Sequence, residues 1–572
     1  MINTKLKTVH HKVDVCVVGG GLGGMCTAIS AARHGAKVLL MQDRPVLGGN
    51  CSSEIRMWVS GAGTRVRDLQ ETGIMEEIML ENMHRNPTRN FTTWDALLYE
   101  KVKFEPNIEL LLNCSCCDAE MDGTDIKFIR GFQLTTYLWH EVEAEIFVDS
   151  SGDSILAPLT GAEYMVGREA KSEFNEEFGL EVADKHTMGM SLMIQCRETD
   201  HPVSYTPPAW AHKFPDDDAM NNKPHNLYHM NTNFYWIELG GMQNSIDDTE
   251  EVRDELLKIA FGVWDHIKNH GDHGAENWEL EWIGFLPGKR ESRRYVGKYV
   301  VTQNDVEAEG RFDDIVAYAG WSMDDHFPEG FYYTKGHPTI YHPAPQPWGL
   351  PLRCMISENI QNLVFAGRNI SVTHAALSSS RVMATCAVLG QALGTAVALA
   401  LRDGCEVADV DIACLQQTLM EDDCYIPWHT RKLPALTLEA ECTAPVVRNG
   451  LDRGEKNCWI GKEGDAIEYR FDGEREIHEI RLVFDNDMNR KYHNMPCNYP
   501  LVQTKFKLPR TLIREYRLEG IDAQGKEFSI HVKDNHQRFI KHGVDWRVER
   551  LRFVPLTTHG CEELRLFDFE IR

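Results

Sequence analysis

The sequence predicts an α/β fold of the Rossmann-like kind, interrupted by an inserted α+β region and followed by an all-β sandwich. Three observations lead to this fold class. An apolar run at residues 13–18 leads into a glycine turn and then a helix, which is the order of a nucleotide-binding βαβ unit. Residues 157–345 lose this βαβ rhythm. From about residue 436 short apolar strands alternate with turn residues, as in a β-sandwich.

The glycine turn has the spacing of a dinucleotide-binding loop. Gly19, Gly21 and Gly24 fit G-x-G-x-x-G, and a helix of small residues is predicted over Met25–His34. In such a turn the glycines allow a tight bend, a close approach of the backbone to a pyrophosphate, and close packing of helix on strand. The helix N-terminus adds free N–H groups and a positive dipole. We therefore expect a dinucleotide here, with a chance glycine turn as the alternative.

The second strand ends where an acidic side chain usually holds the ribose hydroxyls. The strand predicted over Lys37–Met41 ends instead in Gln42 and Asp43. The Gln42 amide can still bond a ribose hydroxyl, and Asp43 is adjacent. We expect both residues at the ribose.

Three further segments resemble the FAD-dependent oxidoreductase family. Residues 44–53 read R-P-x-x-G-G-x-x-S-S, a recurrent signature of that family. Residues 149–153 look like its D-A-T-G-D motif, and residues 362–370 resemble the strand that returns to the flavin before a last small-residue helix. The resemblance covers residues 13–400 in order, and three ordered motifs are more specific than one glycine loop.

This resemblance implies a glutathione-reductase-like flavin domain with FAD as the cofactor. The residues that it places around FAD lie in the glycine loop, the segment after the second strand, the D-A-T-G-D-like motif and the returning segment. They are Gly19, Gly21, Leu22, Gly23, Gly24, Gln42, Asp43, Arg44, Gly49, Asn50, Ser53, Cys116, Asp149, Gly152, Asp153, Gly367, Arg368 and Val382.

Composition limits the partners. The 572 residues carry 60 Lys plus Arg against 86 Asp plus Glu, a net charge of −26, so nucleic acid is not expected because it needs a basic face. No apolar run approaches the roughly 18 consecutive residues of a membrane span. The N-terminus lacks a signal-peptide core, and sixteen Cys then indicate a reducing, cytoplasmic compartment. A homo-oligomer stays open.

The cysteines suggest no metal site. Residues 114–117 contain a C-x-x-C spacing, but no second pair is found elsewhere, and a zinc site needs about four ligands. We expect no metal and interpret this segment as packing near the adenine side of the flavin domain.

Four regions are predicted along the chain. Residues 1–156 and 346–402 form the FAD-binding domain, 157–345 the substrate domain, 403–435 a helical linker, and 436–572 the sandwich. Segments 457–461 and 479–484 resemble galactose-binding-like jelly rolls. Such modules often bind carbohydrate, but many only pack on an enzyme, and both roles stay open. Within these regions we predict an amphipathic helix over 250–269 and strands over 191–195, 234–239, 466–471, 477–484, 515–518, 528–532, 546–553 and 564–569.

Two candidate catalytic residues flank the last flavin helix. His374 precedes that helix, and histidine suits proton transfer from an alcohol near neutral pH. Arg381 stands at the start of the helix, where a cation stabilises anionic reduced flavin. The alternatives are a histidine that holds the loop and a segment whose serines cap the helix.

Three more candidates come from the inserted region. Arg290 and Arg293 lie in a dense basic cluster that is similar to an R-E-S-R-R element of the family, and arginines can clamp a carboxylate or several hydroxyls. Internal ion pairs are the alternative. His326, in Gly320–His326, is a second candidate base or the partner that orients one, and Trp321 could stack on a sugar ring or on the flavin. The alternative is a loop with no active-site role.

These features lead to one leading hypothesis and two rivals. The first is an FAD-dependent oxidoreductase that oxidises or reduces a secondary alcohol or ketone of a polar small molecule, preferably a sugar or glycoside, by hydride transfer to flavin N5. The second is a flavin-dependent reductase or dehydrogenase of a carbon–carbon double bond. The third is a non-enzymatic carbohydrate-binding flavoprotein. Because fold fixes cofactor better than substrate, the electron acceptor stays unknown.

Overall fold

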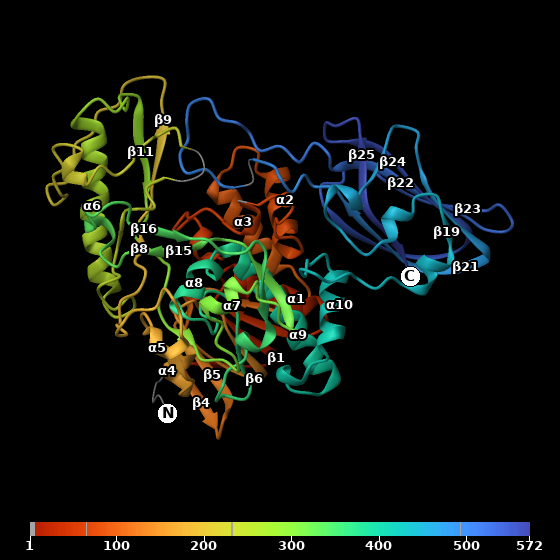
Figure 1. Cartoon of the computed structure of the whole chain (residues 1–572), viewed down its shortest axis with the longest axis horizontal. Coiled ribbons are helices and arrows are strands. Elements are labelled where there is room, and N and C mark those ends of the chain that lie inside the picture. Colours follow the sequence, from red (N-terminus) through yellow and green to blue (C-terminus); the bar gives the residue numbers. More distant parts are fainter. Residues whose placement is uncertain (1–5, 65, 230–232, 492–493) are drawn as a thin grey trace. The chain divides into compact units, whose positions relative to one another are not determined.

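The computed structural model describes residues 6–64, 66–229, 233–491 and 494–572. Residues 1–5 lie outside the described residues. They belong to the N-terminal segment in which no signal peptide was predicted. The chain divides into two compact units (Figure 1). Unit 1 comprises Met1–Ala62, Arg89–Ile412 and Asn494–Thr504, and unit 2 comprises Gly63–Thr88, Ala413–His493 and Lys505–Arg572.

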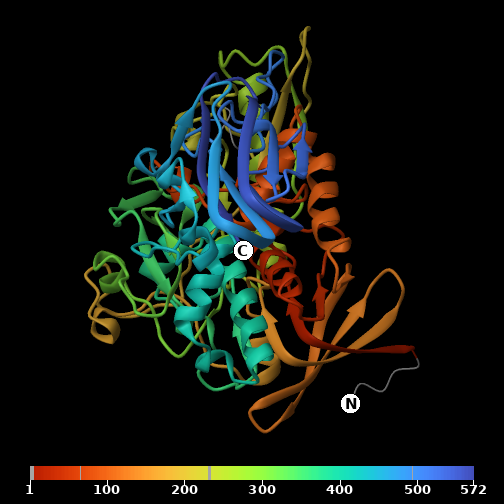
Figure 2. The same ribbon diagram turned by 90° about the vertical axis from the view of Figure 1, so that its right-hand side faces the viewer.

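Unit 1 is built on a mixed seven-stranded sheet with β1 near its middle, in the order β3-β2-β1-β6-β5-β4 and with β18 also paired to β6. The strands β1, β2, β3, β6 and β18 run parallel, whereas β4 and β5 form an antiparallel meander on β6 (Figure 2). This is the predicted Rossmann-like α/β fold. The strands are β1 (Thr8–Val18), β2 (Val38–Met41), β3 (Ile108–Leu111), β4 (Cys114–Asp122), β5 (Asp125–Gln133), β6 (Leu138–Asp149) and β18 (Leu363–Phe365).

Helices α1 (Leu22–Arg33) and α9 (Met383–Asp403) cross in direct backbone contact. A Cβ added to Gly390 would lie 2.1 Å from the carbonyl oxygen of Gly23, and one added to Gly394 would lie 2.3 Å from that of Thr27. The hydroxyls of Ser30 and Thr395 bond at 2.8 Å across the same contact. Small residues are therefore required here, which explains the composition of both helices. The other helices of this part are α3 (Phe91–Lys103) and α8 (His374–Ser380).

Helix α9 has the length and composition of a membrane span, with a mean hydropathy of 1.7, but 94% of its apolar window is buried inside the structure. The helix is thus a buried part of the core of unit 1.

The inserted region contains short strands and one long helix. Helix α6 (Thr249–Asn269) confirms the predicted amphipathic segment, and its apolar face packs with β9 and β11 around a core that contains Trp264 and Trp278 (Figure 1). The remaining elements are α4 (Leu156–Thr160), α5 (Lys171–Phe174), α7 (Gln303–Glu307), β7 (Tyr164–Met165), β8 (Met190–Ser191), β9 (Ile194–Glu198), β10 (Glu238–Leu239), β11 (Trp278–Ile283), β12 (Gly288–Lys289), β13 (Arg294–Tyr295), β14 (Ile315–Ala319), β15 (Met323–His326), β16 (Thr339–His342) and β17 (Trp348–Pro351).

Two predicted strands of this region differ in the structure. The segment 191–195 is divided between β8, which pairs with β10 and β12, and β9, which pairs with β11. The segment 234–239 is reduced to β10, because Phe234 has a φ of 56° and left-handed backbone cannot continue a strand.

A segment from late in the chain completes this region. The carbonyl of Cys196 accepts from the backbone N–H of Tyr499 at 2.8 Å, and the N–H of Cys196 donates to the Asn498 side chain at 3.0 Å. Residues 494–504 therefore extend the β9 edge of unit 1.

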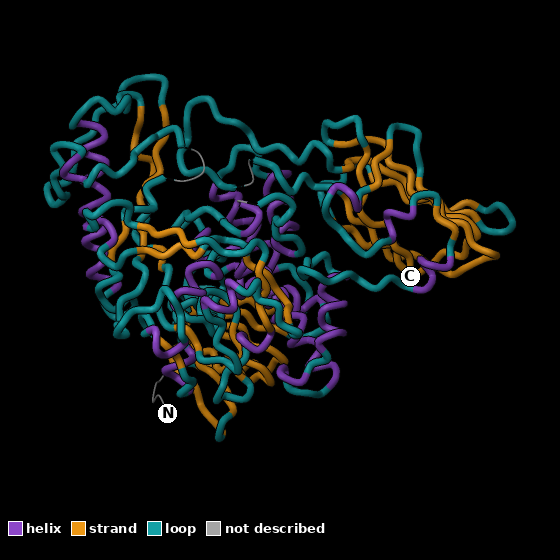
Figure 3. Tube along the Cα trace, in the orientation of Figure 1, coloured by secondary structure: helices purple, strands orange, loops and turns teal. Residues whose placement is uncertain are grey.

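Unit 2 contains a seven-stranded antiparallel sheet in the order β20-β25-β21-β24-β22-β23, with β19 also paired to β21. Strands and loops make up most of this C-terminal part (Figure 3). It confirms the predicted all-β C-terminal fold. The predicted strands 466–471 and 477–484 join into one strand, β21, which register shifts interrupt near residues 470–479. The strands are β19 (Glu441–Cys442), β20 (Trp459–Gly461), β21 (Ile467–Phe484), β22 (Ile513–Ile521), β23 (Glu527–Val532), β24 (Phe539–Thr558) and β25 (Leu564–Ile571).

Among its described residues, unit 2 also contains the α-helices α2 (Ile74–Arg85), α10 (Ile412–Glu421) and α11 (Ala435–Glu439). Helix α2 comes from the early part of the chain, and its Glu76 accepts from the Asn486 amide and from the Arg490 guanidinium, at 2.5 and 2.8 Å. The four-region division of the sequence remains a prediction.

We predict that Gly390→Ala destabilises unit 1, because the added methyl group collides with backbone that cannot move aside. Overpacking of this kind costs about 1–3 kcal/mol. The measurement is the temperature at which bound flavin is released on heating, followed by flavin fluorescence. Gly543→Ala is the matched control, since its Cβ would meet no atom within 4 Å. Equal release temperatures for Gly390→Ala and the wild type would contradict the tight crossing.

Candidate functional site

The three motif glycines occupy distinct surroundings. Gly19 has a φ of 102°, and its Cβ would lie 2.4 Å from the carbonyl oxygen of Ser150, while a Cβ on Gly24 would lie 1.9 Å from that of Gly19. Gly21 differs, since its Cβ would meet nothing within 4 Å. The outer glycines therefore serve packing, and the middle one borders open space in front of α1. A pyrophosphate needs space at this position.

The N-termini of two long helices meet at the same place. No side chain caps α1 at Gly21 or α9 at Val382. A Cβ on Gly23 would lie 3.3 Å from Cα of Gly367 and 3.4 Å from the carbonyl oxygen of Cys386, so the loop after β18 and the first turn of α9 lie against the start of α1, where Leu22 is buried. Two uncapped N-termini favour an anion.

The residue after β2 has a different role from the predicted one. Oε1 of Gln42 accepts from the Gly20 N–H at 2.7 Å, and its Nε2 donates to the Val46 carbonyl at 3.1 Å. This buried amide thus holds the glycine loop, and the exposed Asp43 is left as the ribose candidate. Arg44 lies between Asp43 and Glu54, at 3.6 and 3.7 Å.

The loop after Arg44 lies against the glycine turn. A Cβ on Gly49 would lie 3.2 Å from Cα of Gly21. Asn50 donates to the Lys289 carbonyl at 3.0 Å, and the Ser53 N–H donates to Asp95 at 3.0 Å. Gly49 therefore borders the open space in front of α1, which we call the anion cradle. Asn50 and Ser53 connect this loop to neighbouring segments.

Cys116 is part of the sheet. It lies buried on β4 opposite Gly131, and burial raises the pKa of its thiol well above the ordinary value. In the same C-x-x-C spacing Cys114 is buried while Cys117 is exposed. These cysteines are placed for packing.

Asp149 anchors the end of β6. Its oxygens accept from the Tyr295 hydroxyl at 2.6 Å, from the Leu156 N–H at 2.9 Å and from the Ser151 N–H at 2.9 Å. Burial raises the pKa of this carboxyl, and the donors hold it in place. Asp149 thus fixes the backbone that follows β6 and connects it to Tyr295.

Asp153 is the centre of a polar group at the D-A-T-G-D-like motif. It accepts from Lys289 at 2.7 Å, from Arg368 at 2.6 Å and from Ser292 at 2.8 Å. Burial opposes its charge, but the two cations outweigh burial and hold the pKa of the carboxyl below its usual range. A Cβ on Gly152 would lie 3.1 Å from Nε of Arg368, so this glycine makes room for the guanidinium.

Four of the five predicted catalytic residues gather around β15, in a buried group that we call the charged centre. It consists of Glu238, Arg290, Glu291, Asp324, Asp325, His326, His374 and Arg381. Arg293 lies apart, where it donates to the Asp153 carbonyl at 3.3 Å and stacks on Tyr164.

His374 lies between two carboxylates. Its Nδ1 is 2.9 Å from Glu291, and its Nε2 is 3.0 Å from Asp325. Burial disfavours an imidazolium, but the two carboxylates outweigh burial and raise the pKa of His374 to about 10. The ring therefore carries both protons at neutral pH, which suits a proton donor and not the neutral base that the sequence analysis expected.

Glu238 organises the second half of the charged centre. It pairs with His326 at 2.8 Å and with Arg290 at 3.3 Å. Burial opposes the charge of Glu238, yet Arg290 and His326 lower its pKa to about 2. Arg290 also donates to the Ser191 hydroxyl at 2.8 Å. His326 and Arg290 are thus held by a permanently charged carboxylate.

Arg381 closes the centre beside α8 and α9. One Nη donates to the Asp324 carbonyl at 3.0 Å, and burial lowers the pKa of the guanidinium. Among the described residues, Nε of Arg381 and Oδ1 of Asp324 are buried without a hydrogen-bond partner. Trp321 donates to the other oxygen of Asp324 at 3.1 Å. Oε1 of Glu238 is likewise buried without a hydrogen-bond partner, so the centre has one donor and two acceptors to offer.

The carboxylates were missed as site residues. Glu291, Asp324 and Asp325 lie within the same two segments as the predicted Arg and His residues. Their position next to those residues could have identified them as site residues. Glu238 gave no such signal, because it lies on a short strand far from both segments.

Comparison with known proteins places the chain in a family. A family described as "FAD dependent oxidoreductase" matches residues 14–419. The chain belongs to the FAD-dependent oxidoreductase family. It is an oxidoreductase with FAD as cofactor, and the open space at Gly21 in front of uncapped helix N-termini fits the pyrophosphate of that group.

The curated relatives match only short stretches. A fumarate reductase (cytochrome) of Shewanella frigidimarina is 56% identical over 41 residues, 7% of this chain and 7% of that protein. An aklavinone 12-hydroxylase of Streptomyces peucetius is 37% identical over 81 residues, 14% of this chain and 15% of that protein.

Solved structures share low sequence identity. A geranylgeranyl bacteriochlorophyll reductase-like protein from Thermoplasma acidophilum covers 73% of this chain and 85% of its own at 13% identity, with a TM-score of 0.30. A family 32 carbohydrate-binding module from Streptococcus pneumoniae covers 23% of this chain and 92% of its own at 11% identity, with a TM-score of 0.18.

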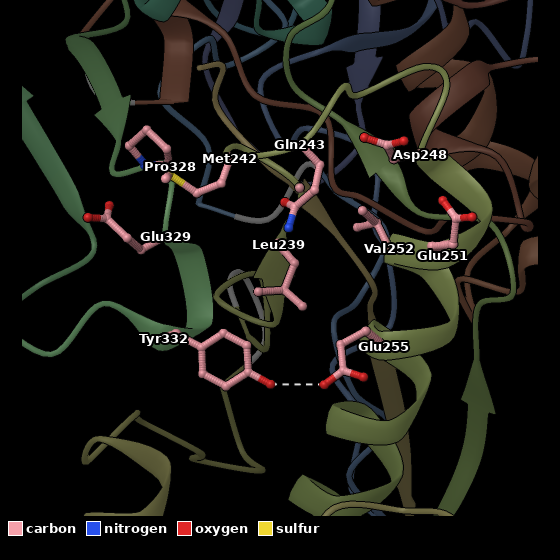
Figure 4. Close-up of a pocket in the computed structure, with 11 residues that line it drawn as sticks. Leu239, Met242, Gln243, Asp248, Glu251, Val252, Glu255, Pro328, Glu329 and Tyr332 are labelled. Atoms are coloured by element: carbon pink, nitrogen blue, oxygen red, sulfur yellow. Dashed lines mark hydrogen bonds between the residues drawn. The ribbon is translucent and has the colours of Figure 1, made fainter. Parts of the chain in front are cut away.

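A pocket of about 380 Å³ lies elsewhere, between the start of α6 and the short helix η4 (Gly330–Tyr332) (Figure 4). Leu239 faces it, whereas the preceding Glu238 belongs to the charged centre, as expected for neighbours on a strand. Tyr332 donates to Glu255 at its rim, at 3.0 Å. No predicted site residue lines this pocket.

Gly21→Val should abolish retention of FAD while the fold persists. The valine side chain enters space that is open in the protein and that the pyrophosphate needs. The readout is the ratio of flavin to protein absorbance after gel filtration, together with the far-ultraviolet circular dichroism. Gly24→Ala is the contrasting variant, since its methyl group collides with backbone and should lower the melting temperature as well. Full FAD occupancy in Gly21→Val would contradict the assignment of the cradle.

His374 should make stability depend on pH on the alkaline side. Because its pKa is raised from 6.5 to about 10, its stabilising contribution is fully present below pH 6.5 and is lost as the pH rises through 10. The loss is at most about 1.4 kcal/mol per pH unit across that window. The measurement is the melting temperature against pH for wild type and His374→Gln.

The two curves should converge toward the alkaline end, with the wild type more stable near neutral pH. His10→Gln, which removes an exposed imidazole, should follow the wild type. A constant difference between wild type and His374→Gln at all pH values would contradict the raised pKa of His374.

Proposed function

We propose that this oxidoreductase interconverts a secondary alcohol and a ketone on a polar small molecule, with a sugar or glycoside as the preferred class. When bound, FAD supplies the redox chemistry by exchanging a hydride with the substrate carbon through its N5. The protein supplies binding, orientation and the proton.

One observation carries this proposal: His374, held between Glu291 and Asp325, and Arg381, which donates to the Asp324 carbonyl, belong to one buried charged centre. The cationic groups of the centre, protonated His374 and the Arg381 guanidinium, stabilise a substrate oxygen as it gains negative charge. His374 can give that oxygen a proton, and Nε of Arg381 can donate a hydrogen bond to it. Since His374 is already protonated at neutral pH, this arrangement supports reduction of a ketone more directly than removal of a proton from an alcohol.

The surroundings support a substrate that carries several hydroxyls. Asp324 and Asp325 can accept hydrogen bonds, Arg381 can donate one, and Trp321 adds an aromatic ring held by its bond to Asp324. Fixed donors and acceptors reject an apolar analogue, which leaves them unpaired. This supports a sugar or glycoside without identifying it.

The charge of His374 also favours a second candidate, reduction of a carbon–carbon double bond. Such a reaction needs a proton donor for the carbon that does not receive the hydride, and a protonated His374 can act as one. The non-enzymatic hypothesis is set aside, because the chain belongs to an oxidoreductase family.

An anaerobic spectroscopic screen separates the two reactions. Sugars and glycosides that are substrates should bleach the visible flavin band, and the matching keto sugars should restore it in dithionite-reduced protein. Enoates that restore the band while keto sugars do not would favour double-bond reduction instead. If neither class changes the band in either direction, the proposal for this class of substrate fails.

With an active compound, His374→Gln should slow flavin turnover by about 10²-fold or more while FAD stays bound. The measurement is stopped-flow absorbance under single-turnover conditions. His478→Gln, an exposed imidazole of unit 2, is the control. An unchanged rate in His374→Gln would remove His374 from the reaction.

A further inference from the structure

Three histidines and an aspartate converge at one end of α6, away from the flavin cradle. Asp217 precedes the short helix η3 (Asp218–Met220), His225 follows in the same loop, His266 lies in the last turns of α6, and His273 lies in the turn after it. The candidate ligand atoms of these four side chains all lie within 4.8 Å of one another. We call this group the His/Asp cluster.

The spacing within the cluster suits a tetrahedral ion. His266 Nε2 is 2.9 Å from Asp217 Oδ1, and His225 Nε2 is 2.8 Å from His273 Nδ1. The distance from His225 Nε2 to Asp217 Oδ1 is 4.0 Å. Ligands about 2.0 Å from a tetrahedral zinc ion are about 3.3 Å apart, so the observed separations bracket that value.

Each imidazole also has one ring nitrogen within hydrogen-bond distance of a backbone carbonyl oxygen. Nδ1 of His266 lies 2.9 Å from the Phe214 carbonyl oxygen, and Nδ1 of His225 lies 2.9 Å from that of Lys223. Nε2 of His273 lies 3.0 Å from the carbonyl oxygen of His270. A carbonyl oxygen only accepts, so each outer nitrogen carries the N–H. Carbonyls in this position orient metal-binding imidazoles in proteins.

This hydrogen bonding leaves acceptors facing one another inside the cluster. The inner nitrogens of His225, His266 and His273 then present lone pairs, and Asp217 adds a carboxylate oxygen. Two lone pairs only 2.8 Å apart, at His225 and His273, repel unless one of the two nitrogens is protonated or a metal cation lies between the groups. A metal cation at the centre would satisfy the three nitrogens and the carboxylate together.

We propose that the His/Asp cluster binds one divalent transition-metal ion, zinc in the first instance, as a structural site. Imidazole and carboxylate ligands suit Zn²⁺, and four protein ligands complete its tetrahedron, which is the pattern of a structural and not a catalytic site. The ion joins the loop 214–225 to α6 and to the turn that follows it. His266 is almost fully buried, with a side-chain exposure of 1%, and Asp217 is the exposed member at 54%.

The expectation that no metal binds rested on the C-x-x-C spacing at residues 114–117, which has no second pair. The four ligands are spread over 217–273 as Asp-x7-His and His-x6-His, and neither spacing resembles a familiar zinc motif. Only the fold brings the two pairs together. The site depends on neither FAD nor the substrate, so its test is independent of the proposed function.

The test uses the full-length holoprotein after removal of any affinity tag. The protein is dialysed against a chelator, reloaded with Zn²⁺ and passed over a desalting column, and zinc per chain is measured by inductively coupled plasma mass spectrometry. We expect about one zinc per chain and a higher melting temperature than in the chelator-treated sample. Mg²⁺, which prefers oxygen ligands, should give no such stabilisation.

His225→Gln and Asp217→Asn are the test variants, because both side chains are partly exposed and their loss should leave the fold intact. We expect each to weaken zinc binding by roughly 10²-fold or more and to melt at the same temperature with and without zinc. His201→Gln, an exposed histidine of the same region, should bind zinc like the wild type. FAD content and circular dichroism confirm folding of each variant.

Two outcomes would overturn the proposal. One is a folded, FAD-containing wild type that retains no zinc after reloading. The other is His225→Gln and Asp217→Asn protein that retains as much zinc as the wild type, which would place the ion elsewhere.

Discussion

The close crossing of α1 and α9 is the constraint on which the rest of unit 1 depends. Gly23 packs against Gly390, and Thr27 against Gly394, with backbone touching backbone. This contact brings two uncapped N-termini to one place and sets α8, which ends where α9 begins, at a fixed distance from the glycine loop. The anion cradle and the histidine of the charged centre are thus positioned by the same two helices.

The charged centre is costly to bury, and its composition shows how the cost is offset. Isolated buried charges are strongly unfavourable, whereas paired and hydrogen-bonded ones are tolerated. Each carboxylate here has a cationic partner, with Glu291 and Asp325 on His374 and Glu238 on Arg290. Because these partners already fix one another, the groups of the charged centre need little rearrangement, which is a requirement for electrostatic stabilisation in catalysis.

Features that lie within one short segment were predictable from the sequence. Features that depend on contacts between distant residues were not. The spacing of Gly19, Gly21 and Gly24 identifies the cradle because the whole motif lies within one turn. The ionisation of His374 depends on Glu291 and Asp325, which come from 83 and 49 residues away. For the same reason the sequence could not show that the Gln42 amide oxygen accepts a hydrogen bond from the Gly20 N–H. Nor could it show that distant histidines meet at the end of α6.

Each unit is built from separate stretches of the chain, and this limits where the protein can be cut or recombined. Residues 494–504 belong to unit 1 although the chain before and after them belongs to unit 2, and residues 63–88 show the converse. Genetic shuffling at a single junction therefore cannot exchange the C-terminal sandwich as a cassette. A truncation at residue 436 would strip the β9 edge from unit 1 and leave the sandwich without α2.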